Sequence, residues 1–222
     1  MRIDLHIHSF HSRDAVNLPK TIIERALEKR LDCIAITDHG SVKAWKELNA
    51  LGRKAGIKVI QGEEIKVFDG KKFLGELIGL FLHEKIKKKE YLDAIDEIRS
   101  QGGLVVVPHP FDFFRNNFER LNECVKEKKI DAIEAFNSRC YFNCFNRKAK
   151  RFAEKNSLPK IAGSDAHFSE EIGRAFTEVK AESIEDARRL VRKGHTKIYG
   201  EKSSFGVHIK TSMRKFNLIK PE

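Results

Sequence analysis

Short apolar runs alternate with longer amphipathic stretches over most of the chain. The apolar runs predict β-strands, at residues 2–7, 32–37, 57–62, 63–68, 76–82, 103–108, 131–136, 160–163 and 176–180. Apolar residues at helical spacing predict helices between many of these runs, at 19–30, 41–55, 89–101, 118–128, 141–156 and 183–193. This alternation is typical of an α/β domain with a parallel sheet, either open or closed into a barrel.

The length of 222 residues is enough for one α/β domain with a substantial core. The chain has no repeat and no low-complexity linker, so we expect one domain over 1–222, in which the basic segment 196–222 packs on the domain or trails from it. No apolar run approaches the ~20 residues of a membrane span, and the first residues lack the features of a signal peptide. A cytoplasmic protein without a membrane partner is therefore expected.

The charge favours anionic partners. Lys and Arg number 43 against 32 Asp and Glu, which gives a formal net charge of +11. Such an excess favours association with phosphates or nucleic acid, although it says little about the fold. The four cysteines lack metal-binding spacing, so they are expected to be reduced thiols.

The first predicted strand carries two histidines on one face. With a period of two, Ile3, Leu5 and Ile7 share one face, while His6 and His8 project side by side from the other. Imidazole is the commonest ligand for first-row metals, so this pair suits one ion. Buried histidines satisfied by hydrogen bonds are the alternative from this strand alone.

Four further apolar runs also end in His, Asp or Glu. These residues are Asp38 and His39, Glu63 and Glu64, His109, and Asp165 and His167. Barrels of parallel strands build their active sites at the carboxyl ends of the strands. A mixture of imidazoles and carboxylates without thiolates suits Zn²⁺, Mn²⁺ or Fe, and the number of candidates favours more than one ion, bridged by a carboxylate. Such clusters activate water as a nucleophile and clamp phosphoryl groups.

Five motifs, in the order HIHSFHSRDA, TDHG, GEEI, PHP and GSDAH, resemble those of the PHP superfamily, named for polymerase and histidinol phosphatase. The resemblance extends over roughly the first 180 residues. It implies a distorted seven-stranded (β/α) barrel, similar to a TIM barrel, with two or three divalent ions (Zn, Mn or Fe) at the carboxyl edge of the strands. Most characterised members hydrolyse phosphoesters.

The resemblance also implies a set of metal ligands, with one ion on His6, His8, Glu64 and Asp165, a second sharing Glu64 with Glu76 and His109, and a third on Asp14, His39 and His167. Glu76 stands where many members have a histidine, and His83 is an alternative at that place. Asp38 is expected to orient a ligand and Glu63 to face the other side of its strand. His11 matches no ligand position.

Three arginines and one asparagine near these motifs are candidates for binding substrate. Arg13 lies in the ligand loop, Arg115 follows an HPFD sequence, and Asn137 and Arg139 follow the run at 131–136. Arginine binds phosphate bidentately, although a surface salt bridge would explain each arginine equally well. The expected place of His195 and His208 is the tail or the surface.

The leading hypothesis is a metal-dependent phosphoesterase, in which a metal-bridging hydroxide attacks the phosphate ester of a nucleotide, a nucleic-acid end or a small phosphomonoester. One alternative is a metal-dependent amide hydrolase, a class that usually binds its metals with a bridging lysine or a larger set of histidines. The other is a non-catalytic PHP protein that binds nucleic acid, although the nearly complete ligand set speaks against it. The oligomeric state is not predicted.

Overall fold

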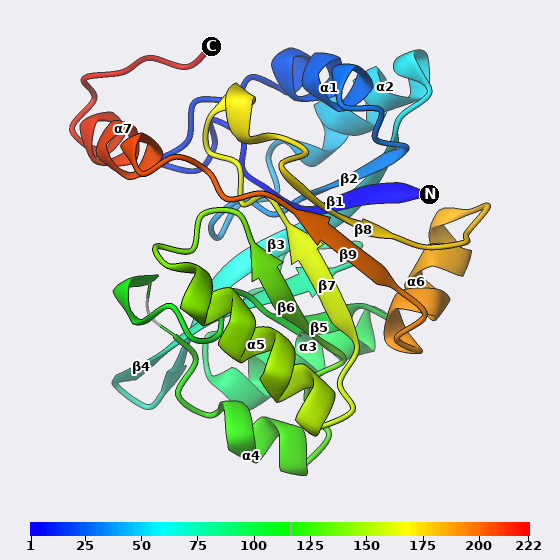
Figure 1. The fold of residues 1–222 in the computed structure, drawn as a ribbon, viewed down its shortest axis with the longest axis vertical. Coiled ribbons are helices and arrows are strands. Elements are labelled where there is room, and N and C mark those ends of the chain that lie inside the picture. Colours follow the sequence, from blue (N-terminus) through cyan, green and yellow to red (C-terminus); the bar gives the residue numbers. More distant parts are fainter. Residues whose placement is uncertain (116) are drawn as a thin grey trace.

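Most of the predicted strands are present, and they belong to one mixed sheet (Figure 1). The computed structural model describes residues 1–115 and 117–222. The order of strands in the sheet is β7-β6-β5-β4-β3-β2-β1-β8-β9. The strands are β1 (Arg2–Ile7), β2 (Cys33–Ile36), β3 (Lys58–Asp69), β4 (Lys72–Leu80), β5 (Leu104–Val107), β6 (Ala132–Asn137), β7 (Lys160–Gly163), β8 (Ala175–Glu178) and β9 (Lys197–Gly200).

The expectation of a seven-stranded barrel of parallel strands is wrong in two respects. The described residues form nine strands, and β4 runs antiparallel to both β3 and β5, as β8 does to β1 and β9. The runs at 57–62 and 63–68 are one long strand, β3, which turns directly into β4. Gly70 and Lys71 form this two-residue turn between the paired residues Asp69 and Lys72, and Gly70 has a positive φ of 58°, which glycine adopts readily.

The sheet curls until its two halves meet, so it is nearly a closed barrel. The segment after β7 lies against β1, where the Asp165 amide donates to the His6 carbonyl at 2.7 Å and the His8 amide donates to the Ala166 carbonyl at 3.0 Å. The Thr177 hydroxyl of β8 accepts from the Ala162 amide of β7 at 2.8 Å. These bonds bring the end of β1 and the end of β7 together.

Seven α-helices accompany the strands in the described part of the chain: α1 (Pro19–Glu28), α2 (Trp45–Ala55), α3 (Tyr91–Ser100), α4 (Leu121–Lys126), α5 (Asn143–Lys155), α6 (Ile184–Arg192) and α7 (Gly206–Lys215). They lie around the outside of the sheet, with α1 and α2 near one another and α3, α4 and α5 together on another side (Figure 1). Within the described residues, we find no helix that has both the length and the apolar character to span a membrane.

Two hydrophobic cores follow from this arrangement. An outer core joins the helices to the sheet, for example Ile22 of α1 with Ile34 of β2. An inner core fills the barrel with residues such as Leu5 and Val106, and Val191 of α6 belongs to it as well. Arg188 and Arg192 of α6 donate to the carbonyls of Gly102 and Gly103, so α6 covers the end of the barrel at which β5 begins.

The C-terminal segment contributes two elements that the sequence pattern did not reveal. Strand β9 pairs with β8, and α7 follows it. The Ser203 amide donates to the Ser138 carbonyl at 2.8 Å, and Arg214 Nε donates to the Ala15 carbonyl at 3.1 Å. The segment therefore packs beside the loop that carries Asp14.

Candidate metal centre

The two histidines of β1 form the floor of the site. Their Nε2 atoms lie 3.0 Å apart, and both side chains are fully buried. The pairing of β1 with β2 shifts register between Asp4 and Ile7, so the strict alternation expected of this strand is broken there. Leu5 packs in the inner core and Ile7 in the outer one, which is the change of face that a bulge produces.

Glu64 lies at the centre of the predicted ligands. Its Oε2 is 3.4 Å from Nε2 of His6, 3.4 Å from Nε2 of His8 and 3.0 Å from Nδ1 of His39. Its other oxygen lies 3.3 Å from Nε2 of His109. One oxygen of Glu64 thus faces three imidazoles and the other faces one, so this carboxylate could serve ions on both sides.

The remaining predicted ligands surround this centre. Asp165 Oδ1 lies 3.6 Å from His6 Nε2 and 3.4 Å from His8 Nε2. Glu76 Oε2 lies 3.8 Å from His109 Nε2, whereas the alternative, His83, bonds through its backbone to Gln101 near α3.

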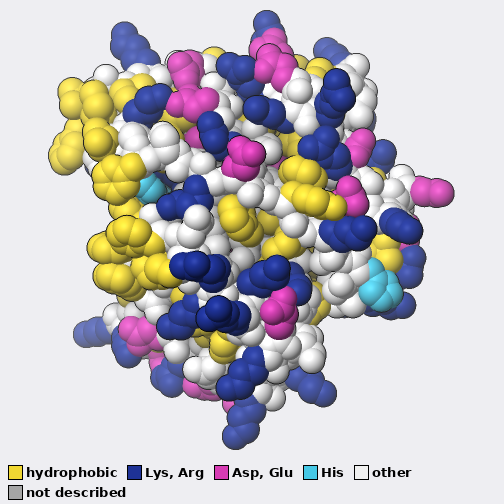
Figure 2. Space-filling model, in the orientation of Figure 1, with side chains coloured by type: hydrophobic (Ala, Val, Ile, Leu, Met, Phe, Trp, Pro, Cys, Tyr) yellow, Lys and Arg dark blue, Asp and Glu magenta, His cyan; other side chains and the backbone are white. Residues whose placement is uncertain are grey.

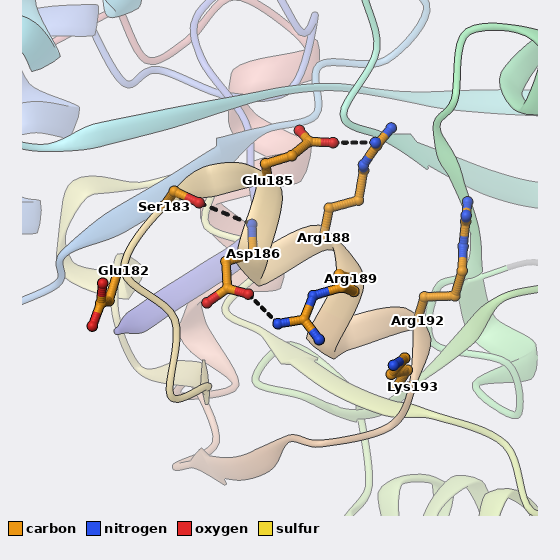
Figure 3. A pocket seen from close by; sticks show the side chains of 8 residues that line it. All are labelled: Glu182, Ser183, Glu185, Asp186, Arg188, Arg189, Arg192 and Lys193. Atoms are coloured by element: carbon orange, nitrogen blue, oxygen red, sulfur yellow. Dashed lines mark hydrogen bonds and ion pairs between the residues drawn. The ribbon is translucent and has the colours of Figure 1, made fainter.

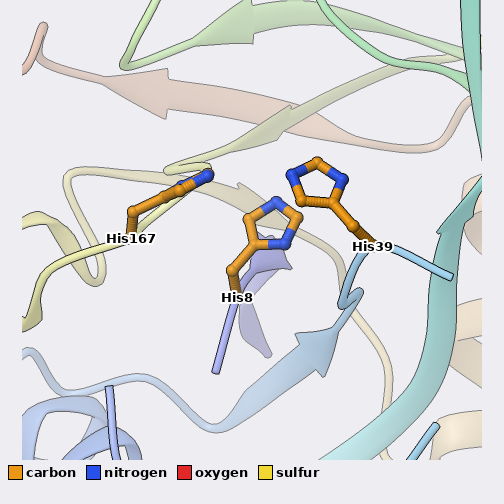
Figure 4. Close-up of side chains that lie close together, drawn as sticks. All are labelled: His8, His39 and His167. Atoms are coloured by element: carbon orange, nitrogen blue, oxygen red, sulfur yellow. The ribbon is translucent and has the colours of Figure 1, made fainter. Parts of the chain in front are cut away.

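A third group of donors is open to the cavity. Asp14 Oδ1 lies 3.6 Å from His39 Nε2 and 3.4 Å from His167 Nε2. The rings of His8, His39 and His167 point toward one another from three separate segments (Figure 4). His8 lies 4.4 Å, between ring centroids, from each of the other two, so it belongs to two groups of donors rather than the one that the resemblance implied.

The spacing of these donors fits divalent ions. Four ligands at the usual Zn–N distance of ~2.0–2.1 Å from one ion lie about 3.3 Å from one another. Buried oxygens of three of these carboxylates, Asp14, Glu64 and Asp165, have no hydrogen-bond partner among the described residues, and each lies at about this distance from imidazole nitrogens. Unpaired buried acceptors are costly unless a cation is bound, so the residues present fit a metal cluster.

A ring of hydrogen bonds holds the ligands in place. Glu134 Oε1 lies 3.0 Å from Nδ1 of His6, and Glu134 Oε2 accepts from the His109 amide at 2.8 Å and from Asn137 Nδ2 at 2.8 Å. A carboxylate on Nδ1 directs the Nε2 lone pair of His6 into the cluster. Sequence reasoning missed Glu134, although it stands in a buried strand where a carboxylate needs a partner.

The loop that carries Asp14 is tied to Asp38. The Ser9 hydroxyl donates to Asp38 Oδ2 at 2.6 Å, and the Ser12 hydroxyl donates to Asp38 Oδ1 at 2.6 Å. Ser12 Oγ also lies 3.2 Å from Nδ1 of His8. Asp38 therefore positions the loop and, through Ser12, the His8 ring. Glu63 faces away from the cluster and accepts from the Ile86 amide at 2.9 Å.

Burial and neighbouring charges set the protonation of the cluster. Burial, followed by the charges of the nearby imidazoles, lowers the pKa of His8 to about 3. Burial also acts to lower the pKa of His39, but the carboxylates of Glu64 and Asp14 outweigh it and raise that pKa to about 9. Burial, and then the charge of Glu64, raises the pKa of Glu76. In the absence of metal ions, protonated imidazoles thus offset the negative charge of the carboxylates.

The predicted substrate-side residues line or border one cavity of about 700 Å³ that opens over the cluster. Arg13 is exposed at its edge. Arg115 Nη1 lies 2.5 Å from Asp165 Oδ2, and Asn137 Nδ2 donates to the same oxygen at 2.8 Å. Arg139 is buried, and its Nη2 donates to the Thr211 hydroxyl of α7 at 2.5 Å. Asn137 thus positions a ligand rather than facing the cavity.

His208 lies in the C-terminal tail, as expected, but it also lines the cavity over the cluster. Its ring stacks on Tyr141 at 3.9 Å between centroids, and both residues line the cavity. The reason is that α7 returns to the open end of the barrel. His11 also borders the cavity, where its ring packs 4.1 Å from that of Phe10, and it belongs to none of the donor groups found among the described residues.

A second hollow, of about 660 Å³, lies around α6 at the opposite end of the barrel (Figure 3). Four of its charged side chains form two ion pairs, Glu185 with Arg188 and Asp186 with Arg189. Arg188 Nη1 also donates at 2.7 Å to the carbonyl of Gly102, just before β5, whereas His109 follows the other end of that strand. This hollow is separate from the ligand cluster.

Comparison with known proteins identifies the family. Residues 143–195 match the family model described as PHP-associated. The chain is 37% identical over 190 residues to an uncharacterized protein of Methanocaldococcus jannaschii, which covers 83% of this chain and 73% of the relative. A second uncharacterized protein of that organism is 33% identical over 149 residues, or 62% of this chain and 82% of the relative. The chain belongs to the PHP superfamily.

Solved structures with the same fold agree with this PHP assignment. A two-domain protein of Bacteroides vulgatus, described as containing a predicted PHP-like metal-dependent phosphoesterase, superposes with a TM-score of 0.77 over 96% of this chain and 69% of its own, at 21% identity. The lesion-specific endonuclease EndoQ of Pyrococcus furiosus gives a TM-score of 0.64 over 89% of this chain and 58% of its own, at 23% identity. A PolC-type DNA polymerase III of Oceanobacillus iheyensis is 38% identical over 69 residues, which is 31% of this chain and 5% of the polymerase.

Proposed function

We propose that this PHP protein is a metal-dependent phosphoesterase, acting on a nucleotide, a nucleic-acid end or a small phosphomonoester. The observation that carries the proposal is the convergence of imidazole and carboxylate atoms at donor spacing beneath an arginine-lined cavity. Arg139 supports it further, because its buried Nη1 has no hydrogen-bond partner among the described residues. A buried guanidinium with a free donor suits the oxygens of a phosphate.

The cluster would hold two or three divalent ions of Zn, Mn or Fe. Ions bound there would supply Lewis-acid activation of a water molecule and of the phosphoryl group. The chain's own residues would do the rest. Arg139 and Arg115 would bind the phosphate oxygens, and Glu134 would keep the Nε2 atom of His6 unprotonated and directed at the cluster.

Two observations favour nucleic acid as the source of the phosphate ester. The chain carries a formal charge of +11, and two of its relatives are a DNA polymerase and a lesion-specific endonuclease. The amide-hydrolase alternative has a neighbour too, an amidohydrolase of Chromobacterium violaceum with bound sulfate and a TM-score of 0.62. At 18% identity this neighbour shares the fold, and it does not decide between phosphate and amide chemistry.

The test is metal content together with hydrolysis. Purified protein is analysed for bound metals, stripped with a chelator, and assayed on p-nitrophenyl phosphate, bis(p-nitrophenyl) phosphate and a p-nitroanilide after addition of Mn²⁺, Zn²⁺ or Fe²⁺. We expect phosphoester turnover that requires metal and that falls more than about 100-fold in His8→Ala, since even partners outside the ligand set cost roughly 10–100-fold. His195→Ala is the matched control. Metal-free protein with no turnover would contradict the proposal, and anilide turnover alone would favour the amide hydrolase.

A further inference from the structure

Aromatic side chains from three separate segments gather at the mouth of the cavity. The residues are Phe113 and Phe114 after β5, Tyr141 and Phe142 before α5, and Phe205 before α7; we call them the aromatic shelf. Ring centroids lie 4.9 Å apart for Phe114 and Tyr141, 6.1 Å for Phe114 and Phe142, and 6.0 Å for Tyr141 and Phe205. Figure 2 shows hydrophobic side chains gathered along the edge of the molecule where α7 and the start of α5 lie.

The shelf is exposed, although it is made of the residues that proteins most readily bury. Phe113 is 63% exposed, Phe114 52%, Phe142 53% and Phe205 65%. Contiguous exposed apolar surface of this kind usually marks a binding site. The aromatic rings in the hydrophobic core need no such account, because they are covered by the fold itself.

The shelf borders the same cavity as the ligand cluster. Phe114 and Tyr141 line the same cavity as Asp14, His39 and His167. Tyr141 is held in place from its backbone, because its amide donates to Asp112 Oδ2 at 2.9 Å and Lys202 Nζ donates to its carbonyl at 2.6 Å. A substrate that reached the cluster from this side would therefore pass over the ring of Tyr141, whose backbone is held in place.

Positive charge accompanies the aromatic rings. The cavity that joins the shelf to the cluster is lined by five cationic side chains, Arg13, Lys66, Arg115, Arg139 and Lys215. Lys and Arg side chains also lie beside the hydrophobic edge on the face seen in Figure 2. Aromatic rings beside a cationic groove match a chain of bases joined by phosphates, because the rings stack on base faces while the cations follow the backbone. A membrane or a protein partner could bind the shelf without the cationic cavity that joins it to the ligand cluster, whereas a nucleic-acid substrate needs both.

We propose that the aromatic shelf binds the unstacked bases next to the reacting phosphate of a single-stranded nucleic acid. This proposal rests on the phosphoesterase function proposed above and names its substrate class. Bases in a duplex are already stacked on one another, so the shelf favours single strands over duplexes. Phe114, the shelf residue adjoining Arg115, takes the base nearest the cluster, and Phe205 takes one further away.

The experiment compares binding and turnover in shelf variants. Phe114→Leu and the double variant with Phe205→Leu keep apolar bulk without an aromatic face, and Phe114→Trp keeps the aromatic face. The matched control is Tyr199→Ala, which removes a 43% exposed aromatic residue of β9 outside the shelf. Fluorescence anisotropy with 5′-labelled single-stranded and duplex 12-mers of DNA and RNA measures binding in chelator. Hydrolysis of the same strands and of bis(p-nitrophenyl) phosphate measures turnover with Mn²⁺.

We expect Phe114→Leu to weaken single-strand binding by roughly 5- to 150-fold, the range measured for one stacked base, with a further loss in the double variant. Phe114→Trp should restore binding, and Tyr199→Ala should leave it unchanged. Equal binding by wild type and the double variant would overturn the proposal, as would equal losses on single strands and duplexes. Light scattering that showed a dimer lost in the double variant would assign the shelf to a second copy instead. Because binding is measured without metal, a protein without phosphoesterase activity would still give a result for the shelf.

Discussion

Glu134 offers a sharp test of how the cluster is held, because every neighbour of its carboxylate is a donor. Its oxygens contact Nδ1 of His6, the amide of His109 and the side-chain amide of Asn137 at 2.8–3.0 Å. A carboxylate only accepts hydrogen bonds, whereas a glutamine presents two donor hydrogens in place of one oxygen. Glu134→Gln therefore keeps the volume of the side chain, but its NH2 group faces an N–H donor from which the carboxylate had accepted a hydrogen bond.

The size of the effect follows from which bond is lost. If the new amide faces His6, the ring must shift its proton to Nε2, the atom that points at Glu64 and Asp165. Loss of a partner behind a ligand costs roughly 10- to 100-fold in metal affinity. If the amide faces His109 instead, a buried donor is left unpaired, at a cost of about 1–3 kcal/mol in the free energy of unfolding.

Titration calorimetry with Mn²⁺ and urea unfolding of the metal-free chain separate these outcomes. Glu154→Gln is the matched control, because Glu154 is an exposed residue of α5 whose carboxylate pairs with Lys160, away from the cluster. We expect weaker metal binding in Glu134→Gln and no change in the control. A folded Glu134→Gln protein with wild-type affinity for metal would refute the role of Glu134 in orienting His6.

Three further predictions concern other parts of the chain. Gly163→Ala would place a Cβ 2.4 Å from that of His6 and 2.8 Å from Glu134 Oε1, so urea unfolding should show a loss of about 1–3 kcal/mol and calorimetry a weaker metal site. Cys144 is exposed while the other three cysteines are buried, so a thiol reagent should modify one thiol in the native chain and four after unfolding. Burial, followed by the charges of nearby arginines, lowers the pKa of His208 from 6.5 to about 4, so the unfolded chain takes up that proton first. The contribution of His208 to the free energy of unfolding is thus complete above about pH 6.5 and is lost as the pH falls toward 4. In His208→Gln the urea midpoint should therefore change less with pH over that range.

Each of these has a contrary result. A Gly163→Ala chain of full stability would mean that β7 does not approach β1 as closely as the geometry requires. Rapid reaction of more than one native thiol would contradict the burial of the cores. A urea midpoint with the same pH dependence in His208→Gln as in wild type would show that His208 titrates normally.

The local pattern of the chain predicted most strands and helices because each is a short apolar or amphipathic segment. The sheet was mispredicted where pairing depends on the turn. The hairpin of β3 and β4 depends on the two-residue turn at Gly70 and Lys71, yet the alternation of strands and helices around it suggested parallel neighbours. Strand β9 was missed since its residues are mostly exposed and carry no apolar run.

The candidate ligands were predictable because they sit in short motifs, and the structure brings all nine to one place. Glu134 was not predictable from the motifs, since its role depends on where β6 lies relative to β1. The same holds for the aromatic shelf, whose members are 28 residues apart between Phe113 and Tyr141 and 64 apart between Tyr141 and Phe205. Residues contributed by α7 could be placed only after the path of the C-terminal segment was known.

The antiparallel hairpin also explains why the cluster can gather so many carboxylates. Glu64 and Glu76 lie on facing strands of one hairpin, two rungs apart in register, and both project into the barrel. Two buried carboxylates at that separation repel each other, which is why burial and the charge of Glu64 raise the pKa of Glu76. A proton on His39, whose pKa is about 9, relieves part of the repulsion without metal. A divalent ion bound there would take the place of that proton and would oppose the same repulsion.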